Sequence, residues 1–199
     1  KGGKAVAVQA NVAKKAEVDH LFAESKKAFG ALDILVNNAG VYEFVPLEDV
    51  TEEHFHRQFN VNVLGLILAT QEAVKQFGPS GGSIVNISSL ASSAAPPTGS
   101  VYSATKAAVH SYTQSLRFQL EDSGVEVIEL MPPAVGTDMT SEFPEEVSKI
   151  TTDELVEQGR PTPLDPSGQV ADPPVASRMS SESRSMVSSV PPALPNSCW

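Results

Sequence analysis

Short apolar runs alternate with longer segments of helical periodicity along the chain as far as Leu130. The runs have the length of buried strands, and we expect strands at residues 5–8, 32–36, 83–87 and 125–130. Between the first two runs, apolar side chains recur on one helix face, with lysine and glutamate on the other. That apolar face consists of Val18, Leu21, Phe22 and Phe29. Strands alternating with helices in this way predict a parallel sheet covered by helices on both faces.

Two later helices are recognised by their ends. Thr51 is a suitable helix cap, and two glutamates follow it in the first turn, where the helix dipole favours negative charge. This helix should end at Phe77, before a Gly-Pro pair. A further helix should carry Tyr102 and Lys106 and end near Gly124.

The composition changes beyond about Arg160. Residues 161–199 hold eight of the fifteen prolines and nine serines, with almost no aliphatic periodicity. Such a segment buries too little apolar surface to offset the entropy lost on ordering. We therefore expect one domain at residues 1–160 and a Pro/Ser-rich, disordered tail at residues 161–199. A packed irregular arm is the alternative for the tail.

The overall composition excludes several classes of protein. With 199 residues, the chain has the length of one domain with a core. Its formal net charge of −10 argues against nucleic acid or an anionic membrane as a partner. The single cysteine, Cys198, excludes an internal disulfide and agrees with a location in the cytoplasm. The four histidines lack metal-ligand spacing, so we expect no metal site and place His54 and His56 at the surface.

The candidate chemistry centres on Ser89, Tyr102 and Lys106. Tyr102 and Lys106 are four residues apart, so their side chains leave the same helix face. An ammonium this close should lower the tyrosine pKa from about 10 and let the phenol exchange a proton near neutral pH. Ser89 follows an apolar strand, where its hydroxyl can hold a carbonyl or alcohol oxygen. Ser88 is the alternative serine, and the Tyr/Lys spacing alone is common by chance.

The tetrapeptide Asn37-Asn38-Ala39-Gly40 directly follows a predicted strand. Small residues at this point let the backbone approach a flat ligand, and ligands of parallel sheets bind at the carboxyl ends of the strands. For the tetrapeptide alone, an ordinary turn is the better interpretation. Its combination with Asn62, Ser89, Tyr102 and Lys106 favours a ligand site.

This ordered set resembles the short-chain dehydrogenase/reductase superfamily, over about residues 3–140. The stretch 41–105 looks most like the ketoacyl-carrier-protein reductase and glucose dehydrogenase branches. The resemblance implies an α/β, doubly wound parallel sheet of the Rossmann type. It also implies an oxidoreductase that uses NAD or NADP to interconvert a ketone and a secondary alcohol. Members of the family act on small molecules and usually assemble as homodimers or homotetramers.

The resemblance assigns a role to each candidate residue. Tyr102 would be the general acid/base, and Ser89 would orient the substrate carbonyl. Lys106 would bind the nicotinamide ribose and lower the pKa of Tyr102, and Asn62 would hold a proton-relay water. The cofactor-binding residues implied are Asn11, Val12, Asn38, Ala39, Gly40, Tyr102, Lys106, Val135 and Thr137.

The sequence departs from the family pattern at both ends. The glycine-rich turn T-G-x-x-x-G-x-G, which lets the backbone approach a pyrophosphate, does not occur in this sequence. The first matching segment corresponds to the family's third strand, and the chain begins at Lys1 rather than methionine. We therefore expect a truncated chain with an incomplete sheet. The alternative to an enzyme is a catalytically silent remnant that serves as an interaction domain or has no function.

Overall fold

The computed structural model describes residues 2–136 and 149–158, and the chain divides into two compact units. Unit 1 comprises residues 1–135 and 144–149, and unit 2 comprises residues 136–143 and 150–199. The tail predicted at residues 161–199 and the candidate Thr137 lie outside the described residues, so the predictions made for them stay untested.

The described helix of unit 2 is α5, Thr152–Gln158. Thr151 caps it: the Thr151 hydroxyl accepts from the Glu154 N–H at 3.1 Å, and the Glu154 carboxylate accepts from the Thr151 N–H at 2.7 Å. This reciprocal pairing is a capping box.

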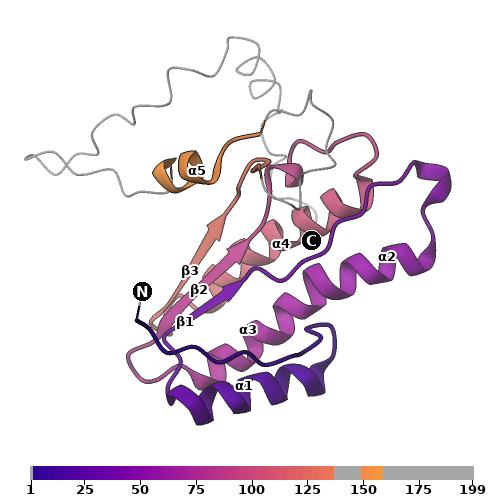
Figure 1. The fold of residues 1–199 in the computed structure, drawn as a ribbon. Helices are drawn as coiled ribbons and strands as arrows, with labels where there is room; N and C mark the ends of the chain where they lie inside the picture. Colours follow the sequence, from indigo (N-terminus) through magenta and orange to yellow (C-terminus); the bar gives the residue numbers. More distant parts are fainter. Residues whose placement is uncertain (1, 137–148, 159–199) are drawn as a thin grey trace, which may run out of the picture. The chain divides into compact units, whose positions relative to one another are not determined.

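Unit 1 contains a three-stranded parallel sheet with the order β1-β2-β3 (Figure 1). The register places Leu35 beside Ile84, and Ile84 beside Val127. The predicted strands at 32–36, 83–87 and 125–130 are thereby confirmed to within two residues at each end. The strands are β1 Ile34–Asn37, β2 Gly82–Ile87 and β3 Val125–Leu130.

The helices of unit 1 also follow the prediction closely. Thr51 is a helix cap, because its hydroxyl accepts from the His54 N–H at 3.1 Å. The helix that it starts continues to Gln76 through one wide π turn. The helical elements are α1 Lys15–Phe29, η1 Leu47–Asp49, α2 Glu52–Phe59, the π turn η2 Asn60–Leu64, α3 Gly65–Gln76, η3 Leu90–Ser92 and α4 Ser100–Gln119. The last of these ends five residues before Gly124. Within the described residues, no helix combines the length and apolar character needed to cross a membrane.

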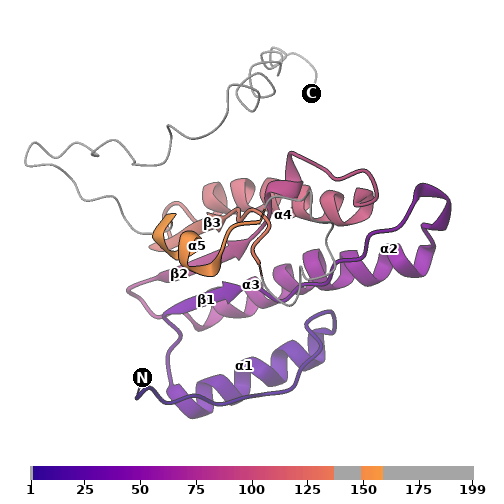
Figure 2. The same cartoon turned by 45° about the horizontal axis from the view of Figure 1, so that its top comes forward.

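The core of unit 1 lies between the sheet and the helices. Ile84, Leu116 and Val127 form one buried cluster, against which Val74 of α3 also packs. Thus α3 and α4 cover the same face of the sheet. A second cluster joins α1 to α3, which lie side by side (Figure 2). It consists of Val18, Phe22, Ala69 and Ala73.

The opposite face of the sheet differs from the prediction. Alternate strand residues that point away from α3 and α4 are exposed: Ile34 by 59%, Val36 by 56% and Leu130 by 41%. Within unit 1, the described helices therefore cover one face of the sheet and not both.

The strand predicted at residues 5–8 does not form. Residues 2–11 carry no strand assignment, because no described strand pairs with them and an extended segment needs a hydrogen-bonding neighbour. The prediction for Phe29 is also wrong. Its ring is 49% exposed at the end of α1, with Lys4 Nζ 5.2 Å from the ring centroid. The core therefore takes Val18 and Phe22 from the predicted apolar face and leaves Phe29 outside.

Candidate active site

Tyr102 and Ser89 meet at the carboxyl end of β2. Ser89 lies two residues after the end of β2 and Tyr102 lies in the first turn of α4, and the Ser89 hydroxyl is close enough to the Tyr102 phenol to affect its pKa. The Ser89 hydroxyl also accepts from the Ala91 N–H at 3.1 Å, which fixes its orientation. Burial raises the pKa of Tyr102 above its ordinary value of 10.0, and the hydrogen bond with Ser89 opposes this more weakly.

Ser88 has a different environment. It is 2% exposed, and its N–H and hydroxyl both point at the Leu130 carbonyl, at 2.9 and 3.4 Å. Ser88 therefore continues the pairing of β2 with β3. Of the two candidate serines, Ser89 is the one in contact with Tyr102.

Lys106 lies one turn after Tyr102 on the same face of α4, as the spacing predicts. Its ammonium donates to the Ile87 carbonyl at 2.9 Å and lies 5.7 Å from the centroid of the Tyr102 ring. Burial lowers the pKa of Lys106 from 10.5. The expectation that Lys106 lowers the pKa of Tyr102 is wrong for this structure. The ammonium is bound by a backbone carbonyl, and the desolvation of the phenol dominates the pKa of Tyr102.

Asn62 occupies the π turn between α2 and α3 and is 3% exposed. Its amide pairs with the backbone of Val41 in both directions, accepting from the N–H and donating to the carbonyl, each at 2.8 Å. The same amide nitrogen donates to the Thr105 hydroxyl at 3.0 Å, and Thr105 precedes Lys106 on α4. The structure thus joins Asn62 to the segment after β1 and to the helix that carries Tyr102.

A group of buried polar residues fixes the strands behind this site; the sequence pointed to Asn37 but not to its partners. The Asn37 amide donates to the Thr70 hydroxyl at 3.1 Å and to the Asn86 carbonyl oxygen at 2.9 Å. The Asn86 amide in turn donates to the Thr113 hydroxyl at 2.9 Å. These four residues, named the asparagine network, join β1, β2, α3 and α4. Their signal in the sequence is an asparagine inside each of two apolar strand runs.

Two predicted cofactor-binding residues lie close together. Val12 and Ala39 line a small crevice of about 20 Å³ beside Gly65. A Cβ atom on Gly65 would lie 2.7 Å from the Val12 side chain, so only glycine allows this approach. Asn38, Ala39 and Gly40 are all exposed at the carboxyl end of β1, and there a ligand can reach their backbone.

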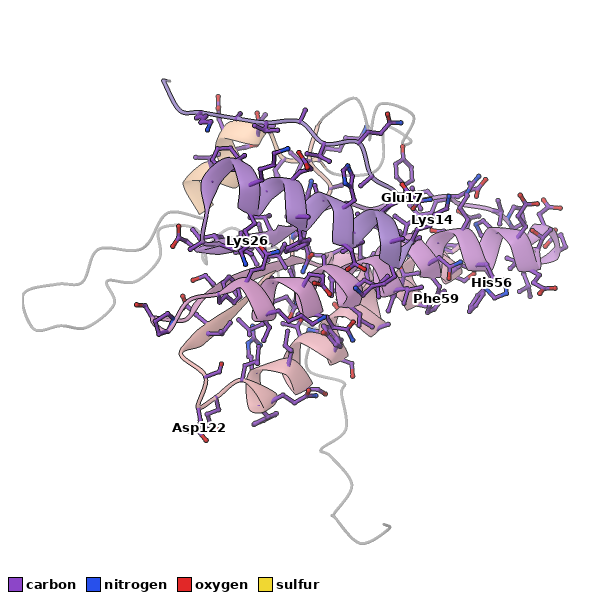
Figure 3. The ribbon with its side chains drawn as sticks, turned by 90° about the horizontal axis from the view of Figure 1, so that it is seen from below. Lys14, Glu17, Lys26, His56, Phe59 and Asp122 are labelled. Carbon is purple, nitrogen blue, oxygen red and sulfur yellow. The ribbon has the colours of Figure 1, made fainter. Side chains whose placement is uncertain are left out.

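Asn11 is engaged in local structure before α1. Its side-chain oxygen accepts from the Ala13 N–H at 3.0 Å, and its N–H donates to the Glu17 carboxylate at 2.7 Å. Lys14 also pairs with Glu17 at 3.2 Å, at the start of α1 (Figure 3). Val135 is partly exposed in the segment after β3, which is joined to η3 by a hydrogen bond from the Leu90 N–H to the Pro132 carbonyl at 3.2 Å.

Two aromatic rings beside Tyr102 were also missed. The centroid of the Phe44 ring lies 5.8 Å from that of Tyr102, and the Tyr42 centroid lies 6.5 Å from it, both in edge-to-face orientation. Both rings come from the segment that follows Gly40. Their signal is the alternation of large side chains in Val-Tyr-Glu-Phe-Val, directly after the Asn-Asn-Ala-Gly turn.

The histidine predictions are half right. His56 is exposed on α2, as Figure 3 shows, whereas His54 is only 8% exposed and therefore buried. His54 borders a cleft of about 230 Å³ that none of the predicted site residues lines. In the part of the chain that the structure describes, no group of His, Cys, Asp or Glu side chains is arranged to hold a metal ion.

Comparisons with known proteins agree on one family. Residues 1–148 match the family described as short chain dehydrogenase. An uncharacterized oxidoreductase of Methylorubrum extorquens is 48% identical over 139 residues, which are 70% of this chain and 56% of that protein. A diacetyl reductase, (S)-acetoin forming, of Staphylococcus epidermidis is 38% identical over 75% of this chain and 59% of its own length.

Solved structures agree with these relatives. The crystal structure of a short chain dehydrogenase from Burkholderia cenocepacia, in complex with NADP, matches with a TM-score of 0.71 and 33% identity. The match covers 79% of this chain and 68% of the other. The chain therefore spans little more than half the length of the curated relatives that it matches.

Proposed function

Because this chain belongs to the short-chain dehydrogenase family, we propose that the protein reduces a ketone to a secondary alcohol, and catalyses the reverse oxidation, with NAD or NADP. The observation that carries the proposal is the approach of the Ser89 hydroxyl to the Tyr102 phenol, one helix turn from the buried Lys106. Phenol, hydroxyl and ammonium meet at the carboxyl ends of parallel strands, where open α/β sheets bind their ligands.

Tyr102 acts in this proposal as the general acid. Its raised pKa keeps the phenol protonated at neutral pH, so that it can donate a proton to the oxygen of a bound ketone. Ser89 orients that oxygen through its hydroxyl. Lys106 and Asn62 are the other two proposed catalytic residues. In the oxidation, Tyr102 must start as the phenolate to accept the proton of the alcohol, so the oxidation should need a higher pH than the reduction.

The residues present fit part of a dinucleotide site. Val12 and Ala39 line the crevice beside Gly65, and Asn38 and Gly40 leave their backbone accessible at the end of β1. We propose that these residues hold the cofactor together with Asn11, Tyr102, Lys106 and Val135; Thr137, which the family resemblance also implies, lies outside the described residues. When bound, the nicotinamide supplies or accepts the hydride. The structure of the Burkholderia dehydrogenase with NADP supports a cofactor of this class.

The substrate is proposed to be a small, uncharged ketone. The similarity to a diacetyl reductase supports this class. So does the aromatic surrounding of Tyr102, because uncharged substituents lose little solvation against aromatic rings. Diacetyl is therefore the first substrate to test, with NADH and NADPH each supplied as the cofactor.

The decisive experiment compares two tyrosines of α4. Tyr102→Phe should lower the turnover of diacetyl by on the order of 10²–10⁴-fold, because proton transfer is removed while the ring is kept. Tyr112→Phe is the matched control, since Tyr112 is half-buried on the same helix and bonds to Thr70 instead. Steady-state consumption of the reduced cofactor measures both. Near-parental turnover by Tyr102→Phe would contradict the assignment.

A second candidate function is a binding domain without catalysis. It is favoured by one observation, namely that no glycine-rich turn for a pyrophosphate occurs in this sequence. This candidate predicts that NADPH titrated into the 199-residue chain gives no saturable fluorescence change in the micromolar range. Saturable binding with diacetyl turnover would exclude it.

We also propose that the protein forms a homodimer or homotetramer. Large apolar side chains are exposed on the helices, with Phe55 and Leu64 at 40% and Phe118 at 79%. Burying them against a second copy would remove apolar surface from water. Light scattering of the purified protein tests this assembly. The location in the cytoplasm stays a prediction.

A further inference from the structure

Three buried polar side chains lie four residues apart along α2 and the π turn. His54 is 8% exposed, Gln58 0% and Asn62 3%. We name them the polar stripe. Polar side chains this well buried need hydrogen-bond partners, and the partners of the polar stripe identify what it holds.

The polar stripe holds the backbone of one segment. Asn62 pairs with both backbone groups of Val41, as described above. The Gln58 amide donates to the Glu43 carbonyl at 3.3 Å, and the His54 ring nitrogen Nε2 lies 3.4 Å from the same oxygen. Gln58 and His54 also contact each other at 2.7 Å. Three successive turns of helix therefore fix residues 41–43.

The held segment carries the two aromatic rings beside Tyr102. Tyr42 lies between the two fixed residues, and Phe44 follows them directly. The far end of the segment is fixed by the Val45 N–H, which donates to the Thr98 carbonyl at 2.9 Å. A Cβ atom on Gly99 would lie 3.0 Å from the Phe44 ring, so this ring packs against the start of α4. Displacement of residues 41–45 would move both rings away from Tyr102.

The hydrogen bonding of His54 and Gln58 is incomplete. His54 Nδ1 and Gln58 Oε1 are buried without a partner among the residues that the structure describes. A buried polar atom without a partner costs free energy, and apolar side chains of the same size would avoid that cost. A contribution to stability therefore does not explain why His54 and Gln58 are polar. We attribute their polarity to a second effect, which is to hold the Glu43 carbonyl in place.

Other contacts to Glu43 are weaker candidates for this role. Arg57 forms an ion pair with the Glu43 carboxylate, but the Arg57 side chain is 55% exposed. Exposed ion pairs are screened by solvent and contribute little. This comparison leaves His54 and Gln58, which are buried, as the residues that fix the Glu43 backbone.

We propose that His54 and Gln58 are positioning residues that hold Tyr42 and Phe44 against Tyr102 through the Glu43 carbonyl. The two rings then form a wall beside the proton donor, against which an apolar substituent of the ketone rests. The selectivity of the site for uncharged ketones with an apolar flank follows from this wall. This inference rests on the proposed role of Tyr102.

The test uses Gln58→Met and His54→Leu in the full chain. Each variant keeps the size of the side chain approximately and removes its hydrogen bonds. His56→Leu is the matched control, because His56 is exposed on the same helix and does not contact residues 41–45. Two measurements are made on each variant. They are the KM values for the cofactor and for ketones with methyl, propyl and phenyl substituents, and hydrogen exchange at the Val45 amide.

Both variants should raise the KM for the phenyl ketone about tenfold. The KM for the methyl ketone and for the cofactor should change little, since the wall contacts only the larger substituent. Exchange at the Val45 amide should become faster, because residues 41–45 lose their support. His56→Leu should alter neither measurement.

Two results would overturn the proposal. One is unchanged substituent selectivity, whether or not exchange at Val45 becomes faster. The other is failure of both variants to fold, which would show that the pair supports the whole domain. A failure of the proposed function is recognised separately: Tyr102→Phe would then keep its turnover, whatever the exchange at Val45 shows.

Discussion

The asparagine network and the polar stripe are both buried and both polar, but they differ in how completely their hydrogen bonds are made. In the asparagine network, each amide nitrogen and hydroxyl has a partner, with distances of 2.7 to 3.1 Å. In the polar stripe, Gln58 donates to the Glu43 carbonyl at 3.3 Å and His54 Nε2 lies 3.4 Å from the same oxygen, while two atoms of this pair have no partner among the described residues.

This difference separates two uses of buried polarity. A complete network fixes strands and helices in one arrangement and contributes to stability. An incomplete network lowers stability, and we explain the one formed by His54 and Gln58 by its effect on the position of the Glu43 backbone. Mutations that remove hydrogen bonds should therefore lower the free energy of unfolding more in the asparagine network than in the polar stripe.

The largest effect is expected from Asn86→Leu in the asparagine network. The substitution removes the acceptor for the Asn37 amide and the donor to Thr113. Each of the two buried groups left without a partner costs about 1–3 kcal/mol, so the free energy of unfolding should fall by about 2–6 kcal/mol. Urea unfolding followed by circular dichroism measures this loss.

Asn38→Ala is the control for that experiment, because Asn38 is exposed and next to Asn37 in sequence. It should leave the urea midpoint almost unchanged. Equal losses in the two variants would show that the asparagine network contributes no special stability, and the comparison would no longer hold.

The ionisation of Tyr102 gives the next effect. Burial raises its pKa above 10.0, so the folded protein keeps the phenolic proton at a pH where the unfolded chain loses it. The unfolded chain then binds fewer protons, and stability should fall as the pH rises above about 10. The folded protein should show a phenolate absorbance titration displaced to higher pH.

Ser89→Ala sharpens this second prediction. The hydrogen bond from Ser89 favours the phenolate, so its removal should raise the pKa of Tyr102 further. Tyr112 also has a pKa raised by burial, and Tyr112→Phe removes its contribution to the absorbance. An unchanged or lowered Tyr102 pKa in Ser89→Ala would contradict the geometry described here.

A smaller effect is expected in the polar stripe. The double variant His54→Leu/Gln58→Met removes the unpaired atoms together with the bonds between the two side chains. Replacing both partners by apolar groups is close to neutral, so the free energy of unfolding should stay within about 1 kcal/mol of the parent. A loss as large as that of Asn86→Leu would abolish the distinction between the two clusters.

The smallest effect is expected at the surface, where Glu72 pairs with Lys75 at 2.7 Å and with Lys15 at 2.9 Å. Hydrogen bonds from these two lysines lower the pKa of Glu72 below 4.5. The stability that they confer is present above pH 4.5 and is lost as the pH falls through the lowered value. Glu72→Gln should cause a small loss at neutral pH that disappears at high salt. A salt-independent loss would contradict a screened surface pair.

The sequence was a good guide wherever the determining interactions are local. Thr51 was recognised as a cap because its partner, the His54 N–H, is three residues away. The strands β2 and β3 were recognised because each is a short, mainly apolar segment of strand length. The shared face of Tyr102 and Lys106 follows from the geometry of one helix turn. The proximity of Ser89 to Tyr102 was predicted from the family resemblance, because the sequence itself does not show which residues meet in space.

The errors concern interactions between distant segments. Residues 5–8 have strand-like side chains, but a strand also needs a neighbour, which no local pattern reveals. His54 was placed at the surface because it lacks metal-ligand spacing and diverges from His56 on a helix, and its contact with Glu43 depends on the path of the chain after β1. The pKa of Tyr102 was predicted with the wrong sign. The ammonium of Lys106 binds the Ile87 carbonyl, and burial of the phenol has the larger effect.

The π turn at Asn60–Leu64 has a consequence for how this helix tolerates insertions and deletions. Residues four apart on an α-helix are separated by about 400°, so a strict four-residue repeat drifts by about 40° at each step. The wide turn absorbs this drift, and Asn62 stays in line with Gln58 and His54. A π turn holds one residue more than an α-helical turn, so deleting one residue here can restore ordinary α-helical hydrogen bonds while α2 and α3 keep their alignment. A single-residue deletion should therefore be less damaging at residues 60–64 than in the middle of α3, where it would rotate the rest of the helix by about 100°.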